Sequence, residues 1–138
     1  MALFDWSKSY ELEIPQIDNQ HKELVRMIND LYGSLKGNGS AETVNQTLSQ
    51  LLRYVEIHFE TEERAMLERG YPGFDAHHHL HEDLRHKVFD LEKDQLLGRE
   101  VATFELLNFL VDWLKNHIAH EDMLFGQYMR NMQRTNLA

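Results

Sequence analysis

Histidines and carboxylates recur on the apolar faces of four helix-like segments, and this recurrence constrains the fold more than any other feature of the chain. A buried histidine or acid is costly, because its polar atoms need partners that a hydrocarbon core cannot supply. Seven such side chains in phase with four apolar stripes suggest one shared partner, and a metal centre is the simplest candidate. The seven are His21, His58, Glu62, His77, His81, His117 and Asp122.

The composition is that of one ordinary globular domain. The chain has 138 residues, 42% of them hydrophobic and 27% charged, which suits a single core and is unlike a disordered protein. Cysteine is absent, so disulfides, iron–sulfur clusters and thiolate zinc sites are excluded. A net charge of −9 argues against nucleic acid or anionic membranes as partners, because both need a basic surface. We therefore expect residues 1–138 to form one domain.

The sequence also bears on where the protein resides. Its apolar runs, such as residues 109–111, are far too short to span a bilayer. The first residues have neither the basic nor the apolar region of a signal peptide. The absence of cysteine is compatible with a reducing cytosol. We expect a cytoplasmic monomer, with an oligomer as the open alternative.

Hydrophobic periodicity predicts four long helices, at about residues 18–36, 41–69, 74–94 and 100–131. Residues 1–17 lack this periodicity and are expected to form an extended arm, with Asp18 as the N-cap of the first helix. Ser40 is a candidate cap of the second helix, and Gly70 its C-terminal stop. Because short connections favour antiparallel neighbours, the fold class expected is all-α, an up-down-up-down four-helix bundle.

Two of the spacings suit a metal centre on the bundle axis. Positions i and i+4 differ by about 40° around a helix and lie about 6 Å apart along it. His58 and Glu62 have this spacing. His77 and His81 share it, so both pairs can reach one point. Imidazole and carboxylate suit iron, manganese or zinc, and five imidazoles with two carboxylates fit two ions bridged by the carboxylates.

The third spacing disagrees with a regular helix, because His117 and Asp122 are five residues apart. In an ideal α-helix they would differ by about 140°, and Glu121 would point closer to the core. A π-bulge between them would bring Asp122 to roughly the phase that Glu121 otherwise holds, and such bulges favour functional sites. We therefore predict a π-bulge between His117 and Asp122.

The other histidines and neighbouring acids are expected to face solvent. The histidines that lie out of phase with the apolar stripes are His78, His79, His86 and His120. Glu60 and Glu63 are likewise interpreted as helix-surface acids. Glu62 is expected in the core instead, because it is in phase with His58 and with the apolar positions around it.

At these residues the chain resembles the hemerythrin family, in particular its single-domain bacterial members. The resemblance covers nearly the whole length. It is carried by Ile17-Asp18-Asn19-Gln20-His21, His58-Phe59-Glu60-Thr61-Glu62-Glu63, Tyr71-Pro72-Gly73-Phe74 before His77 and His81, Trp113-Leu114-Lys115-Asn116-His117-Ile118, and Asp122.

The resemblance implies a non-haem di-iron centre, bridged by an oxo or hydroxo group, that binds dioxygen reversibly for storage or delivery and is not an enzyme. It implies that one iron is completed by His77, His81 and His117. His21 and His58 would hold the other, which keeps an open position for dioxygen. Glu62 and Asp122 would bridge the two irons.

The resemblance also implies an oxygen pocket beside the open position. The residues similar to those that shield it in the family are Leu114, Phe59, Ile118 and Trp113. A dry apolar pocket hinders water and protons from reaching the bound oxygen.

Other functions are weighed against this one. Ferritin-like di-iron enzymes use Glu-x-x-His pairs, and no histidine of this chain has glutamate three residues before it. The zinc-hydrolase motif H-E-x-x-H is absent too, because His81-Glu82 is followed by His86, one residue too late. Sensing or detoxification of oxygen, nitric oxide or iron by the same domain, and a di-iron oxidase, stay open as alternatives.

Overall fold

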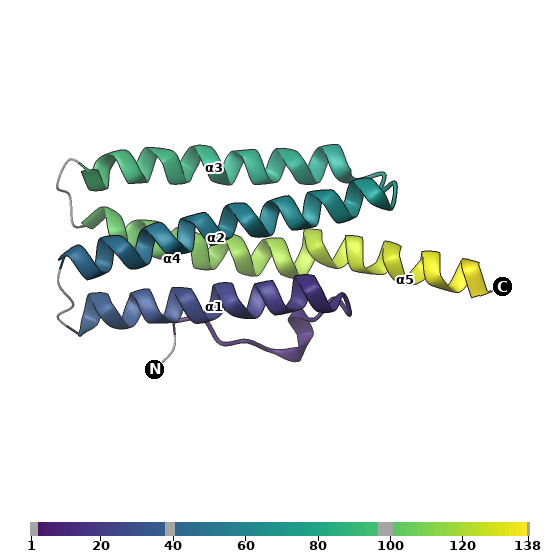
Figure 1. Ribbon diagram of the computed structural model, residues 1–138, viewed down its shortest axis with the longest axis horizontal. Helices are drawn as coiled ribbons and strands as arrows, with labels where there is room; N and C mark the ends of the chain where they lie inside the picture. The colour runs from purple at the N-terminus through teal and green to yellow at the C-terminus, as the bar shows by residue number, and fades with distance from the viewer. Residues whose placement is uncertain (1–2, 38–40, 97–100, 138) are drawn as a thin grey trace.

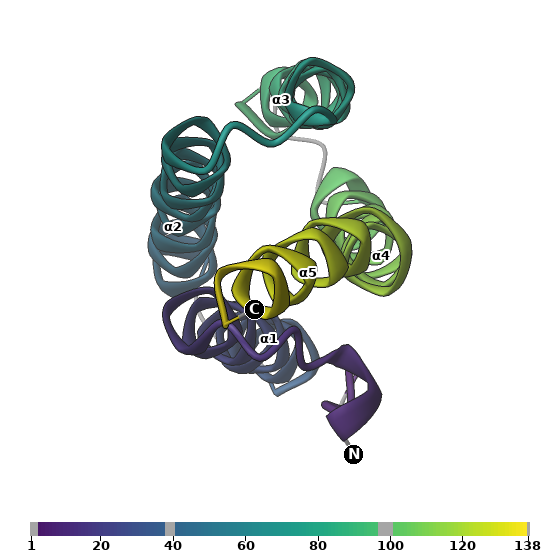
Figure 2. The ribbon, with the colours of Figure 1, turned by 90° about the vertical axis from the view of Figure 1, so that its right-hand side faces the viewer.

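The computed structural model describes residues 3–37, 41–96 and 101–137, and nearly all of them are helical. The elements in chain order are the 3-10 helix η1 (Lys8–Tyr10), α1 (Pro15–Lys36), α2 (Ala41–Glu68), α3 (Phe74–Leu96), α4 (Val101–Asn116), the π-helix η2 (His117–Asp122) and α5 (Met123–Leu137). Because α4, η2 and α5 follow one another in line, the molecule consists of four antiparallel rods (Figures 1 and 2). The expected up-down-up-down bundle is confirmed.

The first helix begins earlier than expected. Its first residue is Pro15, whose fixed φ suits the first turn and whose missing N–H is not needed there. The N-cap is Ile14, which makes no side-chain cap bond, so the assignment of Asp18 as N-cap is wrong. Asp18 is buried inside the first turn instead, where its Oδ1 accepts a hydrogen bond from the Leu12 N–H at 2.8 Å.

The N-terminal arm is less extended and more firmly packed than expected. It contains η1 and runs beside α1 (Figure 1). The Phe4 side chain is fully buried in the bundle. The Phe4 N–H donates to Asn29 Oδ1 at 3.0 Å, and its carbonyl accepts from Asn29 Nδ2 at 2.9 Å. The arm is therefore part of the core.

The end of α2 follows the prediction. Gly70 adopts a φ of 62°, a conformation that glycine reaches without strain. Its N–H donates to the Leu67 carbonyl at 3.2 Å, and the Tyr71 N–H donates to the Met66 carbonyl at 2.9 Å. These two bonds satisfy the last carbonyls of the helix, and the prediction of Gly70 as the stop is confirmed.

The remaining helix ends lie close to their expected places. The second helix ends at Glu68 rather than 69, the third extends to Leu96 rather than 94, and the fourth rod continues to Leu137 rather than 131. Ser40, the candidate cap of α2, lies outside the described residues. Within the part of the chain that the structure describes, each helix is too short or too polar to cross a membrane.

Two apolar clusters fill the bundle and leave a polar layer between them. The larger one includes Phe4, Ile28, Leu51, Leu84 and Leu110. The smaller one consists of Leu12, Ile17, Met66 and Phe125 with their half-buried neighbours. The seven candidate ligands fall between the clusters: along α2, Glu62 follows Phe59 of the larger cluster and precedes Met66 of the smaller.

Candidate metal centre

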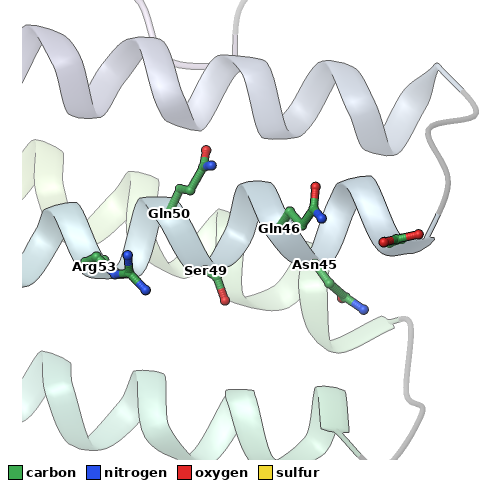
Figure 3. A pocket seen from close by; sticks show the side chains of 6 residues that line it. Asn45, Gln46, Ser49, Gln50 and Arg53 are labelled. Carbon is green, nitrogen blue, oxygen red and sulfur yellow. The ribbon is translucent and has the colours of Figure 1, made fainter.

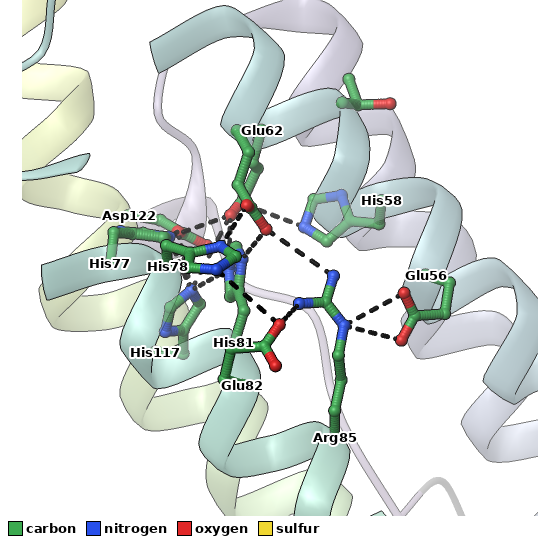
Figure 4. A network of polar contacts seen from close by, with 12 residues as sticks. Glu56, His58, Glu62, His77, His78, His81, Glu82, Arg85, His117 and Asp122 are labelled. Atoms are coloured by element: carbon green, nitrogen blue, oxygen red, sulfur yellow. Dashed lines mark hydrogen bonds and ion pairs between the residues drawn. The ribbon is translucent and has the colours of Figure 1, made fainter. Parts of the chain in front are cut away.

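The structure brings all seven predicted side chains together in the interior. Each is at most 4% exposed. His21 comes from α1, two residues come from each of α2 and α3, and two come from η2. Figure 4 shows six of them converging between the helices, namely His58, Glu62, His77, His81, His117 and Asp122.

The π-helix η2 spans His117–Asp122, which confirms the predicted bulge at the same residues. Its wider turn brings the two end residues onto one side of the helix, with His117 Nε2 3.2 Å from Asp122 Oδ1. Glu121 is half-buried, whereas Asp122 is buried. The local departure from α-helix therefore selects which acid enters the centre.

The two oxygens of Glu62 face different groups of histidines. Oε1 lies 3.1 Å from His77 Nε2 and 3.2 Å from His81 Nε2. Oε2 lies 2.8 Å from His58 Nε2 and 3.2 Å from His21 Nε2. The carboxylate thus stands between two sets of nitrogen donors.

Asp122 divides its oxygens in the same way. Oδ1 lies 3.0 Å from His77 Nε2 and 3.2 Å from His117 Nε2. Oδ2 lies 3.1 Å from His21 Nε2. The donor atoms therefore form two groups, and within each group all atoms lie within 4.8 Å of one another. One group is Glu62 with His77, His81 and His117, and the other is Glu62 and Asp122 with His21 and His58.

Several of the donor atoms lack hydrogen-bond partners within the described part of the protein, and metal ions would supply the missing partners. Among the described residues, His58 Nε2 and both Asp122 oxygens are buried without a hydrogen bond of good geometry. An unsatisfied buried polar atom costs about 1–3 kcal/mol, more if it is charged. Imidazole nitrogen and carboxylate oxygen are suitable donors for iron, manganese or zinc, so metal ions would satisfy the atoms that the protein leaves unpaired.

The carboxylates also change the proton affinity of the histidines. Burial lowers the pKa of His21, but the adjacent Asp122 and Glu62 outweigh burial and raise it to about 9. The same balance of burial against the two carboxylates raises the pKa of His77 to about 10 and that of His117 to about 9. For His58, burial prevails and lowers the pKa.

Both carboxylates are held in the charged form. Burial raises the pKa of Glu62, but His58 and the other nearby histidines outweigh it and hold this pKa well below its usual range. Burial and the charge of Glu62 raise the pKa of Asp122, but the opposing effect of His117 and His21 is larger. The pKa of Asp122 is therefore below its usual range. The centre therefore holds two buried anions, whose charge is balanced by protons or by metal ions on the surrounding imidazoles.

Two further residues contact the histidines from outside the centre, and sequence reasoning missed both. Gln20 Oε1 lies 2.8 Å from His58 Nδ1. Glu63 Oε2 lies 2.9 Å from His81 Nδ1. The interpretation of Glu63 as a surface acid is wrong, because its side chain is only 15% exposed, whereas Glu60 is 70% exposed as expected. Each missed residue is next to a candidate ligand in the sequence, and this adjacency is a signal that could have found it. Helical periodicity alone places both residues on the flank of their helix.

Aromatic rings cover two of the histidines. Phe59 stacks on His81 with ring centres 3.7 Å apart, and Trp113 stacks on His117 at 4.2 Å. Leu114 and Ile118 are buried in the larger apolar cluster. Phe59 and Trp113 therefore contact candidate ligands, and Leu114 and Ile118 belong to the same apolar cluster as Phe59.

One aromatic residue near the centre was not predicted. Trp6, from the N-terminal arm, has its ring centre 6.4 Å from that of His21. Its indole Nε1 is buried and has no hydrogen-bond partner among the described residues. No sequence pattern marks this residue, because the arm has no helical period.

The histidines expected to face solvent do so to differing degrees. His79, His86 and His120 are exposed. The His78 side chain is 44% exposed and contacts Glu63 through Nδ1. None of the four belongs to either donor group among the described residues.

Two of the hollows on the described surface have no histidine in their lining. One hollow is lined by polar side chains of α2 alone, among them Asn45, Gln46, Ser49, Gln50 and Arg53 (Figure 3). It contains no histidine. A smaller cleft of about 230 Å³ lies between α2 and α3, with Phe59 and Leu84 among its apolar lining residues.

This chain is similar to known proteins in sequence and in fold. Residues 12–128 match the sequence model of the family described as Hemerythrin HHE cation binding domain. The chain belongs to the hemerythrin family. The match covers most of the chain and includes all seven candidate ligands.

Curated relatives and solved structures agree. The bacteriohemerythrin of Methylococcus capsulatus is 33% identical over 127 residues, which cover 91% of this chain and 96% of that one. The bacteriohemerythrin of Pseudomonas aeruginosa is 34% identical over 131 residues, covering 95% and 84%. A crystal structure of wild-type hemerythrin matches this family member with a TM-score of 0.83 and 32% identity, covering 91% of this chain and 97% of that one.

Proposed function

We propose that this protein binds dioxygen reversibly at a di-iron centre, for storage of oxygen or its delivery to oxygen-requiring enzymes. One observation carries the proposal: Glu62 and Asp122 each direct one oxygen to each of two groups of histidines. A carboxylate that faces two sets of nitrogen donors is placed to bridge two metal ions. Membership of the hemerythrin family supports iron as the metal.

The two positions differ in their number of histidines. One ion would be held by His77, His81 and His117, the other by His21 and His58, and both would share Glu62 and Asp122 with an oxo or hydroxo bridge. The ion with two histidines would have one protein donor fewer, which would leave room for an external ligand. Ferrous ions held there would supply the electrons needed to bind dioxygen.

The side chains around the ions keep the site dry. Phe59 and Trp113 lie against histidine rings, and Leu114 and Ile118 are each 1% exposed. A water-free apolar surrounding favours release of the ligand as dioxygen over its protonation and loss. No side chain is required to act as acid or base, which favours a carrier over an enzyme.

The test is to load the protein with ferrous iron without air, admit dioxygen and then remove it. We expect two irons per chain and a visible absorption band that appears with dioxygen and disappears on its removal. A band that does not reverse, or rapid oxygen consumption with a reductant, would contradict the carrier and favour an oxidase.

A pair of histidine variants provides the control. His117 and His120 lie on the same helical segment, but His117 is 4% exposed and His120 is exposed. We expect His117→Ala to lose iron and the band, whereas His120→Ala keeps both. Equal behaviour of the two variants would argue against the proposed ligand set.

A further inference from the structure

A polar network outside the metal centre ends on His81 (Figure 4). His81 Nε2 faces the centre, 3.2 Å from Glu62 Oε1, whereas Nδ1 lies 2.9 Å from Glu63 Oε2. An imidazole that binds a metal ion through Nε2 carries its proton on Nδ1. The Nδ1–H of His81 therefore donates to the Glu63 carboxylate, and this bond is largely shielded from water because Glu63 is 15% exposed.

Residues of α3 restrict the Glu63 carboxylate in turn. His78 Nδ1 contacts Glu63 Oε1, and Arg85 Nη2 lies 3.7 Å from Glu63 Oε2. Arg85 is itself held by Glu56, to whose two oxygens its Nε donates at 2.8 and 3.1 Å, and by Glu82. Glu63 is thus one member of a connected set of charges, not a freely rotating surface acid.

The ring of His81 is also fixed on its face. Phe59 stacks on it with ring centres 3.7 Å apart and an angle of 8° between the planes. The Arg85 guanidinium lies 5.2 Å from the centre of the Phe59 ring. Edge and face contacts together hold the His81 ring in an orientation in which Nε2 points to the centre.

The corresponding contact on the other side of the centre is neutral. His58 Nδ1 lies 2.8 Å from the amide oxygen of Gln20, and the Gln20 amide nitrogen donates to Thr61 Oγ1 at 3.1 Å. An anionic acceptor makes an imidazole a stronger donor to metal than a neutral acceptor does. The group of three histidines therefore has the charged partner, and the group of two has the neutral one.

We propose that Glu63 is a positioning residue of the metal centre, fixing His81 as an Nε2 ligand and strengthening its bond to the three-histidine ion. Gln20 orients His58 without adding charge, which leaves the ion with the open position the weaker histidine donor. This inference rests on the proposed function, because it needs a metal ion at each position.

The test compares Glu63→Gln, which keeps the shape of the side chain and removes its charge, with Glu60→Gln on the same helix. Glu60 is exposed and pairs only with Arg64 among the described residues. We expect Glu63→Gln to weaken the binding of one of two Co²⁺ ions by about 10- to 100-fold, and Glu60→Gln to bind both as the unchanged protein does. Stepwise dissociation constants from competition with a coloured chelator measure this.

A second readout separates electronic positioning from a role in folding. In the Co²⁺-loaded protein, we expect the exchangeable Nδ1 proton of His81 to give a strongly shifted NMR signal. We expect Glu63→Gln to move this signal, Glu60→Gln to leave it, and Glu63→Asp, which restores the charge, to recover part of the lost affinity. Circular dichroism checks that each variant is folded.

The outcomes distinguish the two proposals. If the unchanged protein binds fewer than two Co²⁺ ions, the proposed di-metal function fails, and this inference fails with it. If it binds two, but Glu63→Gln binds both equally tightly and its Nδ1 signal does not move, only the role of Glu63 is overturned.

Discussion

At the residue scale, the centre depends on carboxylates that are charged although buried. Glu62 is 1% exposed and Asp122 is 1% exposed, yet the surrounding imidazoles hold the pKa of both acids below its usual range. The same contacts raise the pKa of three histidines. Protons and metal ions thus compete for the same nitrogens, and this competition is measurable.

The first prediction concerns protons released on metal binding. The pKa values of His21, His77 and His117 are raised to about 9, 10 and 9, so these histidines are protonated at pH 7 without metal. A metal ion binds neutral imidazole, so loading at pH 7 must release their protons, and affinity must rise with pH until these pKa values are passed. Calorimetric titration with Co²⁺ in buffers of different ionisation enthalpy counts the protons.

The heat of binding also provides the result that would contradict this prediction. A heat of binding that does not depend on the buffer at pH 7 would mean that no proton leaves, and the raised pKa values would then be wrong. A titration at pH 10 serves as the control, because most of these protons have already left there.

At the scale of the element, η2 supplies two candidate ligands that a regular helix would separate. The π-helix over His117–Asp122 contains one residue more than an α-helix needs for the same turn. Residues beyond the bulge are turned by about 100° relative to an uninterrupted α-helix, and Phe125 then belongs to the smaller apolar cluster. The effect of the bulge is to bring Asp122 into the centre.

The second prediction follows from this extra residue. Deleting the exposed Ala119 removes the extra residue, so His117 and the aspartate become spaced i, i+4 in a regular helix. We expect this variant still to bind two Co²⁺ ions per chain, by titration followed in the visible spectrum.

Deletion of Asp112 is the matched comparison. Asp112 is exposed like Ala119 but lies in α4, before the bulge. Its loss turns everything that follows by about 100°, and we expect binding of both ions to fail. If deletion of Ala119 is as damaging as deletion of Asp112, the π-helix is not the device that positions Asp122.

At the scale of the whole molecule, the polar layer is enclosed by apolar clusters on both sides along the bundle. The N-terminal arm completes this enclosure: Phe4 joins the larger cluster, Leu12 joins the smaller, and Trp6 lies near His21. Glu13, between the arm and α1, has a φ of 65°, which few residues other than glycine adopt. Packing against the two apolar clusters therefore holds the arm in place.

The third prediction tests the contribution of the arm to stability. Phe4 is 0% exposed, and truncating a buried phenylalanine to alanine costs about 3–5 kcal/mol. We expect Phe4→Ala to lower the free energy of unfolding by about this amount in urea titrations of the metal-free protein.

Phe89→Ala is the control, because Phe89 is 60% exposed. It should change the free energy of unfolding by no more than about 0.5 kcal/mol. A loss for Phe4→Ala that is no larger than the loss for Phe89→Ala would show that the arm does not contribute to the core in solution.

The sequence by itself determined the four helices, the seven inward-facing donor residues and the bulge, because each of these depends on spacing along one helix. His58 and Glu62 share a face whatever surrounds them, and the five-residue step from His117 to Asp122 requires a π-turn if both are to face inward. Likewise, Gly70 ends α2 through its own φ and two local bonds.

Only the tertiary structure decided the contacts between segments far apart in the chain. Asp18 has the chemistry of an N-cap, but it bonds to Leu12 because the arm folds back onto α1. Glu63 lies on the flank of α2, and its burial depends on where α3 places His81 and Arg85. Hydrophobic periodicity predicts which face of a helix a side chain occupies. Which residues contact that side chain depends on how the helices pack.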